Sequence, residues 1–166
     1  MRARWLVVGF VSGVLAVLLF HQGAAALLHA LELTRRAPYS MAATVPFGVP
    51  QLWSIAFWGG VWGVLLAAAL EQLRGAALIA AAAVFGAVLP TLVAWCVVAP
   101  LKGQPVAAGF VPAAMLIGPI VNGAWGLGTG IGLALFGRSA GSLRGGDCTL
   151  STTGGQFRRG SKTPAK

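Results

Sequence analysis

The most informative stretch of the chain is Val45-Pro-Phe-Gly-Val-Pro-Gln-Leu-Trp-Ser-Ile-Ala-Phe-Trp-Gly-Gly-Val-Trp-Gly63. It begins in a proline-rich connector and continues into an uncharged apolar segment rich in tryptophan and glycine. A helix needs about 20 apolar residues to cross a hydrocarbon core roughly 30 Å thick. The stretch therefore predicts a connector that leads into a transmembrane helix.

The chain around this stretch is as poor in charge as a membrane protein requires. Of its 166 residues, 57% are hydrophobic and only 9% are charged, whereas a soluble domain carries about 25% charge. The charged residues leave four long uncharged intervals, which are 5–31, 37–70, 75–101 and 103–137. Each interval can hold one crossing, so the sequence predicts an all-α, polytopic membrane protein in the lipid bilayer.

We expect residues 1–137 to form a transmembrane domain of four helices in two hairpins. The expected helices cover 5–31, 52–70, 76–99 and 110–136. Only a short polar turn around Glu71 and Arg74 separates the second helix from the third, which predicts a tight antiparallel pair. Pro90 should kink the third helix, because proline removes a backbone hydrogen bond.

Two segments near the N-terminus allow more than one interpretation. The run 5–31 exceeds the apolar region of a signal peptide, about 7–15 residues, so we expect an uncleaved helix; a signal cleaved near Ala24-Ala-Ala26 is the alternative. The uncharged connector 37–51 holds three prolines. It can lie in the membrane interface or dip between helices, but irregular backbone cannot face lipid.

The basic residues predict orientation rather than nucleic-acid binding. The net charge of +9 arises at helix ends and in 138–166, not on a folded basic face. The segment 138–166 is rich in Gly, Ser, Thr, Arg and Lys, which predicts a disordered basic cytoplasmic tail; attraction to anionic lipid is its alternative role. Arg2, Arg4, Arg74 and the tail outnumber Arg35, Arg36 and Lys102, which predicts both termini in the cytoplasm.

A weak internal repeat links the two expected hairpins. Val49-Pro50 precedes Gly60-Val-Trp-Gly63, and Val111-Pro112 precedes Gly123-Ala-Trp-Gly126. Because each unit would hold two helices, the repeat would be parallel; chance matches are the alternative in so Gly-rich a chain.

Glycines four residues apart let two helices approach closely. Such pairs are Gly9/Gly13, Gly59/Gly63, Gly126/Gly130 and Gly128/Gly132. They predict packing within the chain or, as the alternative, contact with a second copy or another membrane protein.

Polar side chains at membrane depth are the candidate functional residues. His21 lies about 24 Å along the first helix from Trp5, in the outer half of the bilayer. It should face the bundle and meet Gln22, Asn122 or Thr91. This cluster either ties helices together or lines a proton or solute path, since histidine titrates near physiological pH.

A second polar pair, His29 and Glu32, should lie at the outer interface in an i, i+3 contact.

The sequence offers no sign of a metal site. His21 and His29 are about 12 Å apart along one helix, so both cannot bind one metal ion. Cys96 and Cys148 should lie on opposite sides of the membrane, so they predict no disulfide. We find no catalytic constellation and therefore expect no enzyme, metal or cofactor.

Five motifs together resemble a group of small, uncharacterised bacterial inner-membrane proteins with four transmembrane helices. They are Phe20-His-Gln-Gly23, Pro46-Phe-Gly-Val-Pro50, Phe57-Trp-Gly-Gly-Val-Trp-Gly63, Leu92-Val-Ala-Trp-Cys-Val-Val-Ala-Pro-Leu-Lys-Gly103 and Asn122-Gly-Ala-Trp-Gly-Leu-Gly128. The resemblance implies the bacterial inner membrane but no activity.

Our first functional hypothesis is a non-enzymatic accessory or assembly subunit. The alternative is a small oligomeric transporter or channel with a polar path near His21, Gln22 and Asn122. A membrane-bound enzyme is the third.

Overall fold

The structure, a computed structural model, describes residues 2–45 and 47–137; the predicted tail at 138–166 lies outside these ranges. The elements in chain order are α1 (Arg2–Ala16), η1 (Val17–His21), α2 (Gln22–Ala30), β1 (Ala43–Thr44), β2 (Val49–Pro50), α3 (Gln51–Ala69), α4 (Gly75–Val93), η2 (Ala94–Val98), α5 (Ala99–Leu101), η3 (Val106–Phe110) and α6 (Pro112–Phe136). The elements η1 and η2 are single π-helical turns inside longer helices, and η3 is a 3-10 segment.

Four helical spans in the described ranges are long and apolar enough to cross a membrane. They are Ala3–Ala30, Gln51–Ala69, Gly75–Leu101 and Pro112–Phe136. The prediction of an all-α protein with four membrane helices is confirmed. The fourth helix begins at Pro112 and not at 110, because Phe110 has a positive φ of 59° that a helix does not accept.

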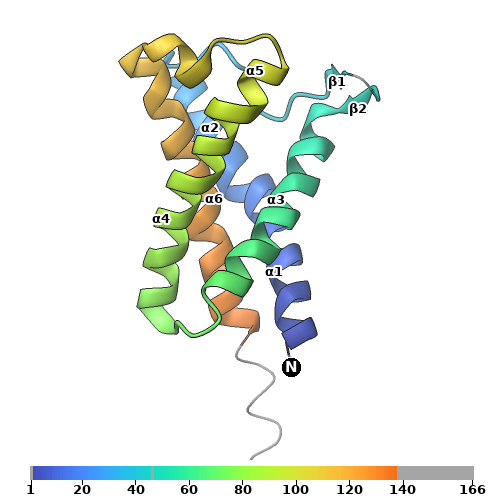
Figure 1. Cartoon of the computed structure of the whole chain (residues 1–166), viewed down its shortest axis with the longest axis vertical. Coiled ribbons are helices and arrows are strands. Elements are labelled where there is room, and N and C mark those ends of the chain that lie inside the picture. The colour runs from blue at the N-terminus through green and yellow to red at the C-terminus, as the bar shows by residue number, and fades with distance from the viewer. Residues whose placement is uncertain (1, 46, 138–166) are drawn as a thin grey trace, which may run out of the picture.

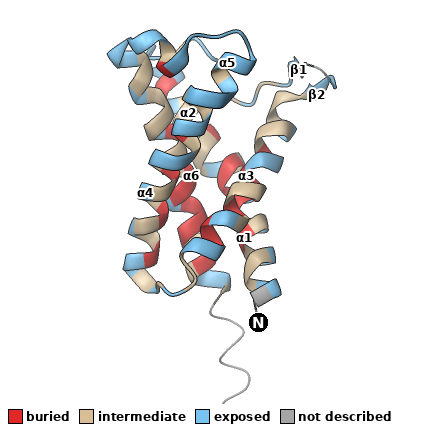
Figure 2. Cartoon of the chain, in the orientation of Figure 1, coloured by how far each residue is buried: buried red, intermediate tan, exposed pale blue. Residues whose placement is uncertain are grey.

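The four spans pack as a bundle in which α1 and α6 form the centre (Figure 1). α1 packs against α3 and α6, and α6 packs in turn against α4. Buried residues line these contacts in the middle of the bundle (Figure 2). The two predicted hairpins, α1–α3 and α4–α6, are therefore the closely packed helix pairs.

The expected tight pairing of 52–70 with 76–99 is wrong. A short turn with Gly75 at φ 57° joins α3 to α4, yet the two helices make few contacts. Where they do meet, the rings of Trp62 and Phe85 lie edge to face with centroids 6.2 Å apart. Two large rings at one level keep the helix axes apart, whereas small residues would let them close.

In the first hairpin, glycines bring the backbones of α1 and α3 into direct contact. A methyl group on Gly13 would overlap the carbonyl oxygen of Gly59. A methyl group on Gly63 would overlap the carbonyl oxygen of Gly9. The two helices can therefore lie this close only because neither carries a side chain at these positions.

The second hairpin makes the same pair of contacts between α4 and α6. A methyl group on Gly86 would overlap the carbonyl oxygen of Asn122, and one on Gly126 would overlap that of Ala82. Asn122 and Gly126 occupy the places that Gly59 and Gly63 hold in the first hairpin, at the offset of the two Gly-x-Trp-Gly copies. The predicted internal repeat therefore corresponds to a repeated packing contact.

The remaining glycine pair, Gly128 and Gly132, faces η1 and α1. Gly128 lies against the ring of Phe20, and a methyl group on Gly132 would come within 2.5 Å of the Ser12 hydroxyl. All four predicted pairs are thus filled within one chain. Contact of these faces with a second copy or another membrane protein stays a prediction.

Both ends of the described chain lie at one end of the bundle, and the 31–50 connector lies at the other (Figure 1). The connector is less irregular than its prolines predict. β1 and β2 form an antiparallel hairpin in which Ala43 pairs with Pro50 and Thr44 with Val49. This hairpin leads directly into α3.

Candidate functional site

His21 is the last residue of the π-helical turn η1. Its ring is partly buried, and its Nδ1 atom is fully buried without a hydrogen-bond partner among the described residues. A buried polar atom without a partner is costly, above all in an apolar medium. π-helical turns are also frequent at functional sites. His21 is therefore the one predicted candidate whose side chain the fold leaves in need of a partner.

Gln22 has a structural task. Its side chain is buried, and its Oε1 atom accepts a hydrogen bond of 2.8 Å from the backbone N–H of Tyr39. Gln22 thereby fixes the connector to the half of the first span that lies away from the N-terminus. This amide satisfies a backbone donor that the irregular connector cannot pair by itself.

The π-helical turn explains a second bond to the connector. The backbone N–H of Gln22 reaches the carbonyls of Val17 and Leu19 and bypasses that of Leu18. The hydroxyl of Tyr39 donates to this Leu18 carbonyl at 2.9 Å. Tyr39 thus stabilises η1 from outside the helix and holds the turn in which His21 lies.

Asn122 and Thr91 meet as a pair across the second hairpin. The Nδ2 atom of Asn122 donates to the hydroxyl of Thr91 at 2.9 Å, and Thr91 is buried. The bond joins α6 to α4 beside the contact of Asn122 with Gly86. Two members of the predicted four-residue cluster, Thr91 and Asn122, therefore bond to each other, while Gln22 bonds to Tyr39.

Two polar contacts that the sequence reasoning missed come from tryptophans. The indole N–H of Trp125 donates to the Gly13 carbonyl at 3.0 Å in the core, and that of Trp5 donates to the Ala67 carbonyl at 2.7 Å. The Arg74 guanidinium lies over the Trp5 ring at 5.9 Å from its centroid. The rule that a buried indole N–H needs an acceptor could have indicated Trp125, although not its partner.

His29 lies in the last turn of α2, and Glu32 lies just beyond the end of that helix. The backbone N–H of Glu32 donates to the His29 carbonyl at 3.0 Å, so their i, i+3 contact is a backbone bond. The Nδ1 atom of His29 is 3.0 Å from the Thr34 carbonyl. Glu32 itself has a positive φ of 58° and ends the helix.

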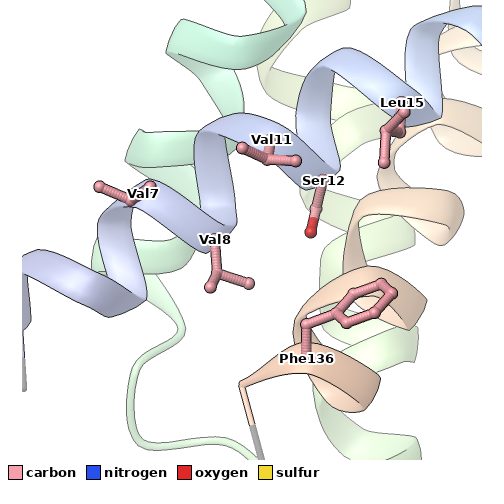
Figure 3. A pocket seen from close by; sticks show the side chains of 6 residues that line it. All are labelled: Val7, Val8, Val11, Ser12, Leu15 and Phe136. Carbon is pink, nitrogen blue, oxygen red and sulfur yellow. The ribbon is translucent and has the colours of Figure 1, made fainter.

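Within the part of the chain that the structure describes, no three His, Cys, Asp or Glu residues gather as metal ligands. Cys96 is free and exposed, and Cys148 lies outside the described residues. An open groove on the surface of α1 beside the end of α6 is apolar (Figure 3). It is lined by Val7, Val8, Val11, Ser12, Leu15 and Phe136. None of the four residues of the predicted polar cluster (His21, Gln22, Asn122 and Thr91) lines this groove.

Neither a protein-family model, nor a curated protein, nor a solved structure matches this chain. The resemblance to small bacterial inner-membrane proteins therefore stays a prediction.

Proposed function

We propose that the chain is a non-enzymatic accessory or assembly subunit that binds another membrane protein in the bacterial inner membrane. The observation that supports this is how the polar groups at membrane depth are used. Gln22 holds the connector, Asn122 holds Thr91, and Trp125 holds the backbone of α1. Such a bundle is suited to present a fixed surface to a partner.

The test is site-specific photo-cross-linking in the native membrane, followed by purification in a mild detergent. A photoreactive residue replaces one exposed side chain at a time, Trp58 on α3, Val84 on α4 or Leu19 on η1. The expected result is a discrete cross-linked protein from one face only, and the same protein in fixed stoichiometry after purification. A chain that purifies alone and cross-links to no protein from any face would refute the proposal.

A transporter or channel, acting as an oligomer, is the second candidate, and the buried Nδ1 of His21 favours it. A water or ion that passes this atom would supply the partner that it lacks in the described residues. Proteoliposomes carrying a pH-sensitive dye test this idea. Proton flux that His21→Leu abolishes and His29→Leu retains would support it, and flux equal to that of empty liposomes would exclude it.

For the topology, we propose that both termini and the 70–74 turn face the cytoplasm. The start of α1, which contains Arg4, and the turn between α3 and α4, which contains Arg74, lie at the end of the bundle where the described chain starts and finishes (Figure 1), and basic residues favour the cytoplasmic side. Cysteines at Gln104 and Gln72, both exposed, in a Cys96→Ala, Cys148→Ser background, test the sidedness. An impermeant thiol reagent added to intact cells should label position 104 and spare position 72.

A further inference from the structure

The tip of the β1–β2 hairpin carries two large apolar side chains that the bundle does not cover. Val45 is 94% exposed and Phe47 is 87% exposed. They come from a connector and not from a membrane-facing helix, where such exposure would be ordinary. In water, two bare apolar side chains at one turn would be unfavourable, so their surroundings need an explanation.

The backbone of this hairpin satisfies many of its own polar groups. The N–H of Gly48 donates to the Thr44 carbonyl at 2.7 Å, and the hydroxyl of Thr44 donates to the Val49 carbonyl at 2.8 Å. The N–H of Gln51 donates to the Ala42 carbonyl at 2.9 Å. Gly48 allows the turn through its positive φ of 66°. A segment bonded in this way can enter a poorly hydrated layer at low cost.

The bonds of Tyr39 fix the depth of the hairpin in the bilayer. Tyr39 is tied to Gln22, and the N–H of Leu52, in the first turn of α3, donates to the Ser40 carbonyl. The start of α3 therefore lies level with Gln22. Gln22 is about 26 Å along the first span from Trp5, close to the far boundary of a hydrocarbon core roughly 30 Å thick.

The length of α3 agrees with this depth. Its 19 residues span about 28 Å, whereas α2 continues for about 12 Å beyond the level of Gln22. α2 therefore extends past the boundary at which α3 begins. The hairpin lies to one side of the helices, at the end of the bundle away from the N-terminus (Figure 1).

The surface next to the hairpin has the character of a membrane interface. Residues 37–70 contain no charge. The first turns of α3 expose Trp53, Phe57 and Trp58, and aromatic residues gather where the hydrocarbon meets the lipid headgroups. The tip is thus continuous with the lipid-facing surface of α3.

We propose that the 43–50 hairpin is an interfacial lipid anchor, with Val45 and Phe47 embedded in the leaflet opposite the chain termini. The anchor sets the depth in the bilayer of α3, the shortest of the four spans. Through the bond of Tyr39 to the Leu18 carbonyl, it also holds the connector against η1. This role is independent of whether the chain is an accessory subunit or a transporter.

An environment-sensitive fluorophore on a cysteine at Phe47 tests the anchor. The full chain, in a Cys96→Ala, Cys148→Ser background, is placed in nanodiscs of phosphatidylethanolamine and phosphatidylglycerol that include a nitroxide lipid. The matched control is a cysteine at Gln104, which is exposed at the same end of the bundle. We expect a blue-shifted emission at position 47 that the nitroxide lipid quenches and aqueous iodide does not, and a water-like emission at position 104.

Two outcomes would overturn the anchor. Emission at position 47 that is as water-like as at position 104 would show that the tip is solvated. Shielding that occurs in native membranes but not in nanodiscs would show that a protein covers it.

A second variant, Val45→Asp with Phe47→Asp, provides an independent check. Neither side chain takes part in the hydrogen bonds of the hairpin, so the helix content should stay unchanged. A fluorophore on a cysteine at Met41 should then lose its quenching by the nitroxide lipid. Unchanged quenching at position 41 would contradict the anchor.

Discussion

Replacing Gly13 by alanine tests the backbone contact between α1 and α3 most directly. The new methyl group would overlap the Gly59 carbonyl oxygen and lie 3.2 Å from the Gly60 Cα atom. Both neighbours are helix backbone, so no flexible side chain can move aside. Overpacking of this kind costs about 1–3 kcal/mol, which corresponds to roughly a 5- to 150-fold change in the unfolding equilibrium. The repeated contact predicts a loss in the same range for Gly86→Ala, whose methyl group would meet Asn122 and Gly126.

Gly23→Ala is the matched control. Gly23 lies in α2 with no neighbouring atom within 4 Å of the added methyl group, so only the backbone preference changes. That preference favours alanine in a helix by up to about 1 kcal/mol. The free energy of unfolding is measured by SDS titration of each purified variant in mixed micelles. If Gly13→Ala unfolds at the same SDS fraction as Gly23→Ala, the direct backbone contact is refuted.

Three further predictions concern hydrogen bonds. Trp125→Phe should lower the free energy of unfolding by about 1 kcal/mol in the same titration, because its indole N–H bonds the backbone of α1; no loss would contradict that bond. A double-mutant cycle of Asn122→Ala and Thr91→Val should give a coupling energy of about 0.6 kcal/mol, and additive effects would exclude the pair. Tyr39→Phe removes the donor to the Leu18 carbonyl, so amide hydrogen exchange in 17–23 should accelerate; unchanged exchange would show that η1 does not depend on Tyr39.

The contacts between the two hairpins differ on the two sides of the bundle. Between the hairpins, α1 and α6 meet through small residues such as Ser12 and Gly132, which allow close approach. α3 and α4 meet through the rings of Trp62 and Phe85. The two hairpins therefore share the same internal packing contact. Between them, the α1–α6 interface is close and the α3–α4 interface is wide.

The membrane class and the helix count could be predicted from the sequence, because both depend on local composition. A charge-free run of about 20 residues has few stable options other than a transmembrane helix. The Gly-x-Trp-Gly copies also indicated the repeat, since glycine spacing determines which helix faces can touch. The candidate site was predictable only in part: the Asn122–Thr91 pair joins two of its four residues.

Only the tertiary structure decided which helices are neighbours and how the polar groups are used. The short 70–74 turn suggested that α3 packs on α4, yet α1 is the close partner of α3, because ring size and not chain connection sets the distance between helices. The Tyr39 hydroxyl donates to the Leu18 carbonyl, which the Gln22 N–H bypasses in η1, and no residue pattern reveals this contact. Gln22 is therefore engaged in holding the connector, and His21 keeps a buried nitrogen without a partner in the described residues.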